Sequence, residues 1–287
     1  MLIIGCSNSR ILAKNIAKIL KVEYSELTVK KFPDSELYIK FETEIKNKEL
    51  VFIQTLHPSN EAILELILAA HTAKELEAKK IILVTPYLAY IRQDKRFNPG
   101  EAVSSKIVGK LLEIFDKVIT IDPHLHRFKS LKEVFHTQTL KLTSNGLIEE
   151  FIAKKFKNPI IIGPDEESYQ WARETALAIG AHAAIFKKKR FSSTKVRVIL
   201  KSPIDVKNKD IIIIDDIIST GHTILEAIKN LKIHKPKSIT VIGIHGIFAD
   251  KKIYQEIKKY STIYTTNTIE NPHAKIDISN LIANSLK

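Results

Sequence analysis

Two adjacent carboxylates follow a run of four isoleucines in the segment IIIIDDIISTGHT, residues 211–223. Neighbouring like charges repel each other unless a cation or a row of hydroxyl groups lies opposite them. The vicinal hydroxyls of a ribose and a Mg²⁺ ion both meet that requirement. A helix that begins just after the carboxylates would offer its N–H groups to a phosphate, beside the small residues Ser219, Thr220, Gly221 and Thr223. The segment predicts a ribose-phosphate site, and a solvated turn with a hydroxyl cap is the alternative.

Three more charged segments follow apolar runs: YLAYIRQDKRFNPGE (87–101), IDPHLHR (121–127) and FKKKRFSST (186–194). Arginine can pair with a polyphosphate or stack on a base, and an Asp-x-His spacing can contact a metal ion. Consecutive cations on a loop can serve as a localisation or nucleic-acid tag. The respective alternatives are a salt-bridged surface loop, a structural histidine and a solvated hairpin tip.

Short apolar segments alternate with segments of helical period along the whole chain. Strands are predicted at 2–5, 50–55, 81–87, 117–122, 159–164, 183–190, 195–200, 210–215 and 238–246. Helices are predicted at 11–20, 61–76, 104–115, 145–156, 167–180, 222–233 and 277–287. This alternation predicts parallel sheets buried on both faces, with ligands bound at the carboxyl ends of the strands. The likeness of 79–87 to 209–217 indicates a duplication, and chance explains that likeness nearly as well.

The composition limits the class of protein. The 287 residues carry a net charge of +13, which attracts polyanions such as nucleic acid, a membrane surface or phosphorylated metabolites. A lysine-coated surface that keeps the chain in solution is the plainer reading. The single cysteine, Cys6, excludes an internal disulfide, and the longest apolar stretch, 62–70, contains Glu65. With no signal peptide visible, we expect a soluble, cytoplasmic protein that does not bind membranes.

Six segments together resemble, in order, the motifs of the ribose-phosphate pyrophosphokinase family. The segment DDIISTGHT resembles a loop that this family shares with type I phosphoribosyltransferases, whereas YIRQDKR resembles a motif that those transferases lack. The remaining four are KFPDSELYIK (31–40), IDPH, GPDEES (163–168) and KKKR. The resemblance implies an α/β fold of two tandem phosphoribosyltransferase-like (type I) domains, each a mainly parallel sheet flanked by helices. The implied domains are 1–140 and 141–276, with the helix at 277–287 packing on the first.

The resemblance also implies a reaction and a set of residues that perform it. The expected reaction transfers the pyrophosphoryl group of MgATP to the C1 hydroxyl of ribose 5-phosphate, with Mg²⁺ as cofactor. The implied catalytic residues are Lys188 and Arg190, and the implied metal contacts are His124 and Asp165. ATP would contact Phe32, Asp34, Glu36, Arg92 and Gln93. Ribose 5-phosphate would contact Arg190, Asp215, Asp216, Ser219, Thr220, Gly221, His222 and Thr223.

The implied partners are ATP, ribose 5-phosphate and further copies of the chain. The family's phenylalanine reaches the adenine from a neighbouring subunit, so at least a dimer is expected, with the adenine site shared between subunits. No nucleic-acid partner is expected, because no aromatic residues alternate with the cations of KKKR. A phosphoribosyltransferase and a regulatory subunit without catalysis are the rival readings. Three positions depart from the family's pattern: Ser219 where aspartate is frequent, His222 where glycine is common, and Phe97 where an acid is frequent.

Overall fold

The computed structural model describes residues 1–125, 127–165, 168–190, 196–200 and 205–287, without the side chains at 170, 186–190 and 196–200. The chain divides into two compact units. Unit 1 comprises Met1–Thr143, Thr268–Glu270 and Ile278–Lys287. Unit 2 comprises Ser144–Asn267 and Asn271–Asp277.

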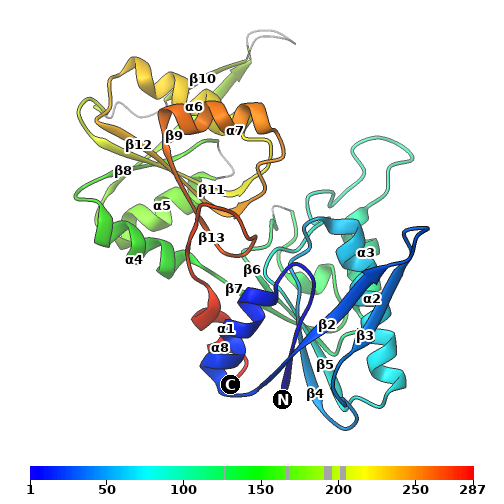
Figure 1. Ribbon diagram of the computed structural model, residues 1–287. Helices are drawn as coiled ribbons and strands as arrows, with labels where there is room; N and C mark the ends of the chain where they lie inside the picture. Colours follow the sequence, from blue (N-terminus) through cyan, green and yellow to red (C-terminus); the bar gives the residue numbers. More distant parts are fainter. Residues whose placement is uncertain (126, 166–167, 191–195, 201–204) are drawn as a thin grey trace. The chain divides into compact units, whose positions relative to one another are not determined.

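Within its described residues, unit 1 has one sheet of seven strands in the order β3-β2-β1-β4-β5-β6-β7 (Figure 1). The strands are β1 (Leu2–Gly5), β2 (Glu23–Lys31), β3 (Leu37–Phe41), β4 (Glu49–Ile53), β5 (Lys80–Thr85), β6 (Lys117–Ile121) and β7 (Gln138–Leu142). The helices are α1 (Arg10–Leu20), α2 (Ser59–Glu75), α3 (Ser104–Leu112), α8 (Ser279–Ser285) and the 3-10 turn η1 (Leu131–Glu133). The strands pair in parallel except β2 and β3, which form an antiparallel hairpin. Helix α8 packs against α1, which lies on β1 and β2.

Unit 2 likewise has one sheet of seven strands in its described residues, in the order β10-β9-β8-β11-β12-β13-β14. The strands are β8 (Ile160–Gly163), β9 (His182–Arg190), β10 (Val196–Leu200), β11 (Asp210–Ile218), β12 (Ser238–Gly246), β13 (Thr262–Thr266) and β14 (Ala274–Ile276). The helices are α4 (Asn145–Lys155), α5 (Tyr169–Ala178), α6 (His222–Ile233) and α7 (Lys251–Tyr260). The hairpin of β9 and β10 is antiparallel, and the other pairs are parallel. The expected class of mainly parallel sheets flanked by helices is therefore confirmed.

The isoleucine run of β11 is apolar throughout because helices cover both faces of this sheet. Alternate side chains of a strand point to opposite faces. Ile211 and Ile213 pack into a core that includes residues of α6 and α7, whereas Ile212 and Ile214 pack into a core that includes residues of α4 and α5. A strand buried on both faces shows no polar alternation, so the run marks β11 as a central strand of unit 2.

The two sheets repeat one strand order, because the order of unit 2 equals that of unit 1 with each strand number raised by seven. The repeat supports a duplication, but it corrects the pairing that the sequence indicated. Residues 209–217 fall on β11, whose counterpart is β4, whereas residues 79–87 fall on β5 and its following loop. Similar apolar character of two central strands misled the comparison, since burial on both faces imposes it on each of them.

Candidate active site

Strand β11 carries Asp215 and Asp216 beyond the end of its neighbour β8. The sequence predicted a strand that ends at residue 215, but β11 continues to Ile218 because β12 accompanies it, with Ile218 opposite Gly246. On the other side β8 ends at Gly163, and its pairing with β11 covers only Ile211, Ile212 and Ile213. The two carboxylates therefore lie at the carboxyl end of the sheet, past the point where β8 can cover them, which is where open α/β sheets bind ligands.

A serine brings two of the predicted carboxylates together. The Oγ of Ser168 lies 2.9 Å from Oδ1 of Asp165 and 2.7 Å from Oδ1 of Asp215. A hydroxyl has one proton and can donate it to only one of these oxygens. The Ser168 N–H gives Asp165 a second hydrogen bond of 3.0 Å. The sequence reasoning missed Ser168; its signal is its place in GPDEES, on the loop after β8, next to a central strand.

The electrostatics of this cluster favour a cation or a row of donors. Burial by surrounding protein atoms raises the pKa of Asp215 well above 3.8, and the nearby charges of Asp216 and Asp165 raise it further. Hydrogen bonds from Ser168 and from the Asp216 N–H oppose that rise without cancelling it. Since these acids disfavour one another's charge, a bound Mg²⁺ or a set of sugar hydroxyls would relieve the repulsion.

The loop after β11 leads into the N-terminus of α6, and the N-cap residue of this helix has no side chain to cover the first N–H groups. Gly221 is the N-cap residue of α6, with φ +86°, and it has no side chain to accept from the first N–H groups. His222 and Thr220 lie beside it, with 3.1 Å between the His222 Nδ1 and the Thr220 Oγ1. Backbone N–H groups at the start of a helix, with hydroxyls beside them, suit a phosphate. Together with Ser219 and Thr223, these residues form the loop that the sequence predicted.

A second segment holds this loop in place. The N–H groups of Ile247 and Phe248 donate to the Ile218 carbonyl at 3.0 and 3.1 Å, and the Ala249 N–H donates to the Ser219 carbonyl at 2.9 Å. The Phe248 ring packs against Tyr254 and His273, whose centroids lie 5.0 and 5.8 Å away. Sequence reasoning did not single out this support, because its residues are distant from the loop along the chain.

Unit 1 carries different side chains at the equivalent places. Gly5 and Gly163 end the equivalent strands β1 and β8, and Gly5 pairs with Ile53. From that register, Gln54 and Thr55 stand where unit 2 has its two aspartates. The Gln54 Oε1 accepts from the Asn8 N–H at 3.0 Å, so a partner within the unit already satisfies it. The ribose-phosphate pattern is therefore a property of unit 2.

Three of the predicted nucleotide and metal contacts of unit 1 lie on two neighbouring loops. Arg92 and Gln93 follow β5, and His124 follows β6. The two strands pair in parallel, with Thr85 opposite Thr120, so their carboxyl ends and the loops after them begin side by side. The Gln93 carbonyl accepts from the Ser105 N–H at 3.3 Å, which fixes the first loop to the start of α3.

Phe32, Asp34 and Glu36 form the tip of the β2–β3 hairpin. The sequence placed the segment 31–40 on no strand end, and its alternation is typical of a hairpin strand. The structure has a hairpin there, with the three residues in its connection. The Phe32 N–H donates to the Glu36 carbonyl at 2.9 Å, and the Glu36 N–H donates to Oδ1 of Asp34 at 3.2 Å. The Phe32 ring meets Tyr38 edge-on and remains 50% exposed. An aromatic ring so exposed at the end of a hairpin is available to another molecule. The ribbon shows the β2–β3 hairpin projecting from its sheet (Figure 1).

Lys188 and Arg190 lie on β9, where their backbone positions pair with Val198 and Val196 of β10. Their side chains, and the whole of residues 191–195, lie outside the described part of the chain. The predicted site residues thus lie in both units, and those of unit 1 lie at the hairpin tip and on the loops after β5 and β6.

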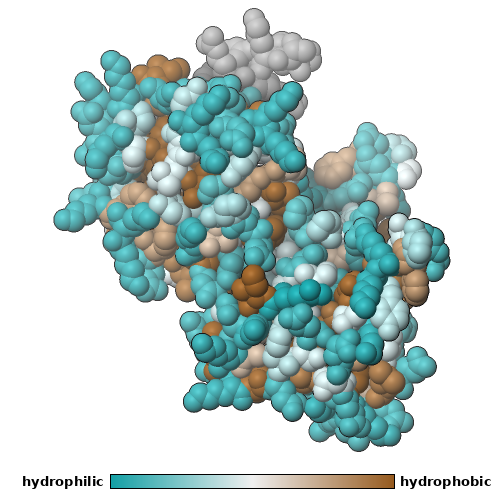
Figure 2. Space-filling view, viewed as in Figure 1, coloured by the Kyte–Doolittle hydropathy of each residue, from teal (hydrophilic) through white to brown (hydrophobic). Residues whose placement is uncertain are grey.

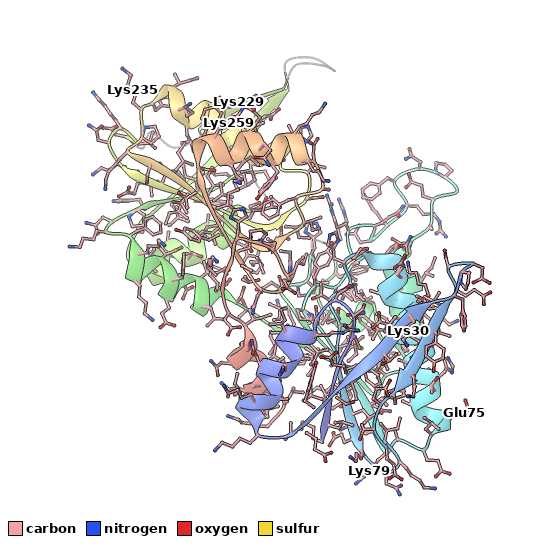
Figure 3. The ribbon with its side chains drawn as sticks, in the orientation of Figure 1. Lys30, Glu75, Lys79, Lys229, Lys235 and Lys259 are labelled. Carbon is pink, nitrogen blue, oxygen red and sulfur yellow. The ribbon has the colours of Figure 1, made fainter. Side chains whose placement is uncertain are left out.

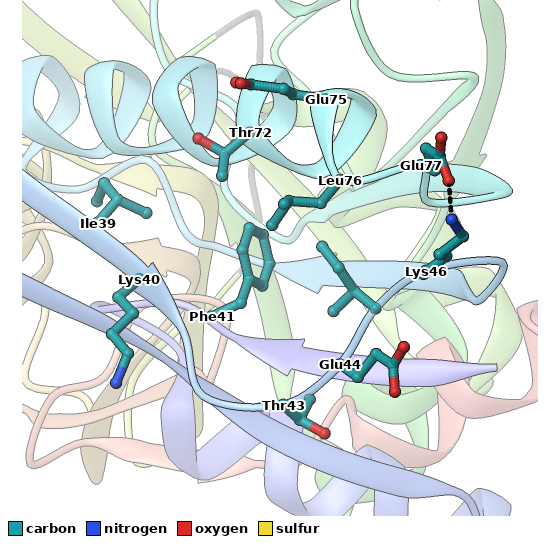
Figure 4. A pocket seen from close by; sticks show the side chains of 11 residues that line it. Ile39, Lys40, Phe41, Thr43, Glu44, Lys46, Thr72, Glu75, Leu76 and Glu77 are labelled. Atoms are coloured by element: carbon teal, nitrogen blue, oxygen red, sulfur yellow. Dashed lines mark ion pairs between the residues drawn. The ribbon is translucent and has the colours of Figure 1, made fainter.

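Other surface features do not coincide with these groups. A groove of about 540 Å³ lies between β3 and the end of α2 (Figure 4). Phe41 and Leu76 face one another across it, Lys46 pairs with Glu77 at 2.5 Å, and none of the predicted site residues lines it. Hydrophilic residues cover most of the visible face (Figure 2), and lysines such as Lys229 and Lys235 extend outward (Figure 3).

The described residues contain neither a membrane-spanning helix nor a cluster of three metal-binding side chains. None of their helices is both long and apolar enough to span a bilayer. None of their His, Cys, Asp and Glu side chains form a group of three that could hold a metal ion. A site with few protein ligands suits Mg²⁺, which keeps several waters and commonly binds through one or two carboxylates and the substrate's phosphates.

Comparison with known proteins places the chain in a family. Residues 1–115 match the model described as the N-terminal domain of ribose phosphate pyrophosphokinase, and residues 130–280 match the phosphoribosyl transferase domain. The ribose-phosphate pyrophosphokinases of Methanobrevibacter smithii and Pyrococcus furiosus are each 34% identical, over 100% of both chains. The crystal structure of phosphoribosylpyrophosphate synthetase from Mycobacterium smegmatis shares the fold, with TM-score 0.85, 24% identity, and coverage of 99% of this chain and 97% of that one. The chain belongs to the ribose-phosphate pyrophosphokinase family.

Proposed function

We propose that the two units divide the work of this enzyme, unit 2 binding ribose 5-phosphate and unit 1 binding ATP. The enzyme transfers a pyrophosphoryl group from ATP to the C1 hydroxyl of ribose 5-phosphate, giving 5-phosphoribosyl 1-pyrophosphate and AMP. One observation carries the assignment of the sugar: Asp215 and Asp216 extend past β8 and lead directly to the N-terminus of α6. Unit 1 has Gln54 and Thr55 in place of those acids.

In unit 2, the two aspartates would accept hydrogen bonds from the ribose hydroxyls. Their mutual repulsion disfavours the empty site, so donors that satisfy both carboxylates gain affinity from relieving it. The 5-phosphate would lie at the first turn of α6, against Thr220, Gly221 and Thr223, with Ser219 and His222 at its edge. Gly221 matters because the loop needs its positive φ, and because a side chain there would press against Ile253 and Ile257 of α7 and displace the start of α6.

In unit 1, Arg92 would pair with the phosphates of ATP, and Gln93 would contact the nucleotide beside it. Mg²⁺ would neutralise the phosphate charge when bound, and the proposed metal contacts are His124 in unit 1 and Asp165 in unit 2. The surroundings of Asp165 support a nearby cation, because the Ser168 Oγ lies within hydrogen-bond distance of both Asp165 and Asp215, and the charge of Asp165 helps to raise the pKa of Asp215. Few protein contacts leave room for the waters and phosphate oxygens that Mg²⁺ keeps.

The reacting groups need positioning and charge neutralisation more than covalent help, as in phosphoryl transfer generally. Lys188 and Arg190, from β9, would supply cations to the group in transfer, and Arg190 would also contact the ribose 5-phosphate. The chain's exposed Phe32, with Asp34 and Glu36, would bind the adenine of a neighbouring subunit, which makes the working form at least a dimer. A cytoplasmic location suits a lone, buried and free cysteine, Cys6.

Calorimetric titration with ribose 5-phosphate alone tests the division of work. Asp216→Asn should abolish measurable ribose 5-phosphate binding and leave ATP binding unchanged. Asp210→Asn is the matched control, because Asp210 begins the same strand at its opposite end, paired with Lys237 at 2.8 Å. Equal loss of ribose 5-phosphate binding in the two variants, or loss of ATP binding with Asp216→Asn, would refute the assignment.

A further inference from the structure

An ion pair joins the two loops that carry the proposed nucleotide and metal contacts of unit 1. The Nη1 of Arg127 lies 2.8 Å from Oδ1 and 3.1 Å from Oδ2 of Asp94, so one guanidinium nitrogen faces both carboxylate oxygens. Asp94 follows Gln93 directly on the loop after β5, and Arg127 stands three residues after His124 on the loop after β6. The ion pair therefore links the two loops directly.

The environment of this pair is unlike that of an ordinary surface ion pair. The Asp94 side chain is only 4% exposed, whereas Arg127 is 48% exposed. A carboxylate so well covered strongly favours keeping its partner, because an unpaired buried charge is costly. The pair of Lys31 with Glu61, by contrast, leaves both side chains about half exposed or more and contributes little.

Aromatic contacts add to the same link. The ring centroid of Phe97 lies 5.2 Å from the Arg127 guanidinium and 5.2 Å from the Lys95 ammonium. The Phe97 N–H donates at 2.8 Å to Glu101, which also accepts from the Asn98 N–H at 3.0 Å. Arg127 thus contacts the first loop at two points, the carboxylate of Asp94 and the ring of Phe97, and the loop is itself braced by Glu101.

We propose that Asp94 and Arg127 are a positioning pair that sets the distance between the Arg92–Gln93 segment and His124 for ATP. The proposal rests on the proposed nucleotide role of those residues. Neither member of the pair needs to touch the nucleotide. Small displacements of positioning groups can change rates and affinities by large factors, so a broken link lowers ATP affinity through Gln93 and His124.

The pair has a second consequence, which is electrostatic. Arg127 offsets the charge of Asp94, which lies on the loop proposed to bind the phosphates of ATP. Removing only Arg127 would leave that negative charge facing the phosphates, and removing only Asp94 would leave a free cation near them. If direct attraction of phosphate dominated, the two single variants would change ATP affinity in opposite directions, whereas loss of positioning lowers it in both.

Steady-state kinetics with Arg127→Met, Asp94→Asn and the double variant test the proposal. We expect each single variant to raise KM for ATP about tenfold and the double variant to raise it no further than the worse single variant. KM for ribose 5-phosphate should stay unchanged, because its site belongs to unit 2. Lys129→Met is the control, since it removes an exposed cation from the same loop and should leave both KM values unchanged.

Three outcomes would overturn the proposal. If Arg127→Met raises KM for ATP while Asp94→Asn lowers it or leaves it unchanged, Arg127 attracts the nucleotide directly. If both KM values and the melting temperature change together, the pair only stabilises the fold. If neither single variant changes KM for ATP, the link has no role in binding. A wild-type enzyme that fails to bind ATP would refute the proposed function instead, which separates the two failures.

Discussion

Replacing Gly221 with alanine should destabilise the proposed ribose-phosphate loop, residues 219–223, for two reasons whose costs can be measured separately. The residue has φ +86°, a backbone conformation that costs an L-residue with a side chain about 1–2 kcal/mol. A Cβ at this position would also lie 2.8 Å from Cδ1 of Ile257 and 3.2 Å from Cγ2 of Ile253, both on α7. Overpacking of this kind costs about 1–3 kcal/mol. The two costs together lower the free energy of unfolding by about 2–5 kcal/mol.

Two comparisons isolate the packing cost in denaturant unfolding. Gly180→Ala is the matched control in unit 2, because Gly180 has φ +66° and nothing within 4 Å of an added Cβ. It should lose only the backbone cost, about 1–2 kcal/mol. Ile257→Val removes the Cδ1 atom that the new Cβ would meet, so Gly221→Ala combined with Ile257→Val should be less destabilised than the sum of the two single variants.

The same variants should differ in catalysis. Gly221→Ala moves the start of α6, so KM for ribose 5-phosphate should rise at least tenfold, whereas Gly180→Ala should leave it unchanged. The reasoning is refuted if Gly221→Ala costs no more stability than Gly180→Ala, or if Ile257→Val gives no relief. It is also refuted if KM for ribose 5-phosphate is unaffected in a folded Gly221→Ala variant.

Three further predictions concern the charged and aromatic residues. The pKa of Asp215 is raised in the folded protein, so its ionised carboxylate reduces stability above that pKa. Asp215→Asn should therefore lose ribose 5-phosphate binding but melt at a higher temperature than wild type at pH 7.5, and this thermal advantage should vanish as the pH falls toward 3.8. A lower melting temperature than wild type at pH 7.5 would contradict this. Phe32→Ala should raise KM for ATP about fivefold to 150-fold, since stacking on a base contributes about 1–3 kcal/mol. It should leave the melting temperature unchanged, because the ring is half exposed. A lower melting temperature with an unchanged KM for ATP would make Phe32 a structural residue. Lys188→Ala should lower kcat about 100-fold or more with little change in either KM, as measured by steady-state AMP release, and an unchanged kcat would remove Lys188 from the mechanism.

Periodicity located the central elements of the fold well. The helix predicted at 222–233 matches α6, and the strand predicted at 238–246 matches β12, because both carry strong apolar patterns imposed by burial. Other elements escaped prediction. Helix α7 has Asp250 as its N-cap, and the carboxylate of Asp250 accepts from two N–H groups. The many lysines of this helix obscure the apolar stripe that it buries. Strand β7, whose side chains are half-buried or exposed, lacks the continuous apolar run of a central strand.

The candidate site divides in the same way between local and distant information. The acids and small residues of 215–223 are contiguous, so their pattern alone indicated a ribose phosphate. The contact of Ser168 with Asp215, and that of Arg127 with Asp94, join residues 47 and 33 positions apart. Such contacts follow from which strands lie side by side, and only the strand order of the two sheets supplies that information.

One assay tests the central claim most directly. Purified protein would be incubated with Mg²⁺, ATP and ribose 5-phosphate, and the products would be separated by chromatography. The account predicts AMP and 5-phosphoribosyl 1-pyrophosphate in equal amounts, formed only when ribose 5-phosphate is present and abolished by removing Mg²⁺ with EDTA. The absence of AMP, together with tight binding of 5-phosphoribosyl 1-pyrophosphate, would contradict it and favour a transferase or a regulatory subunit.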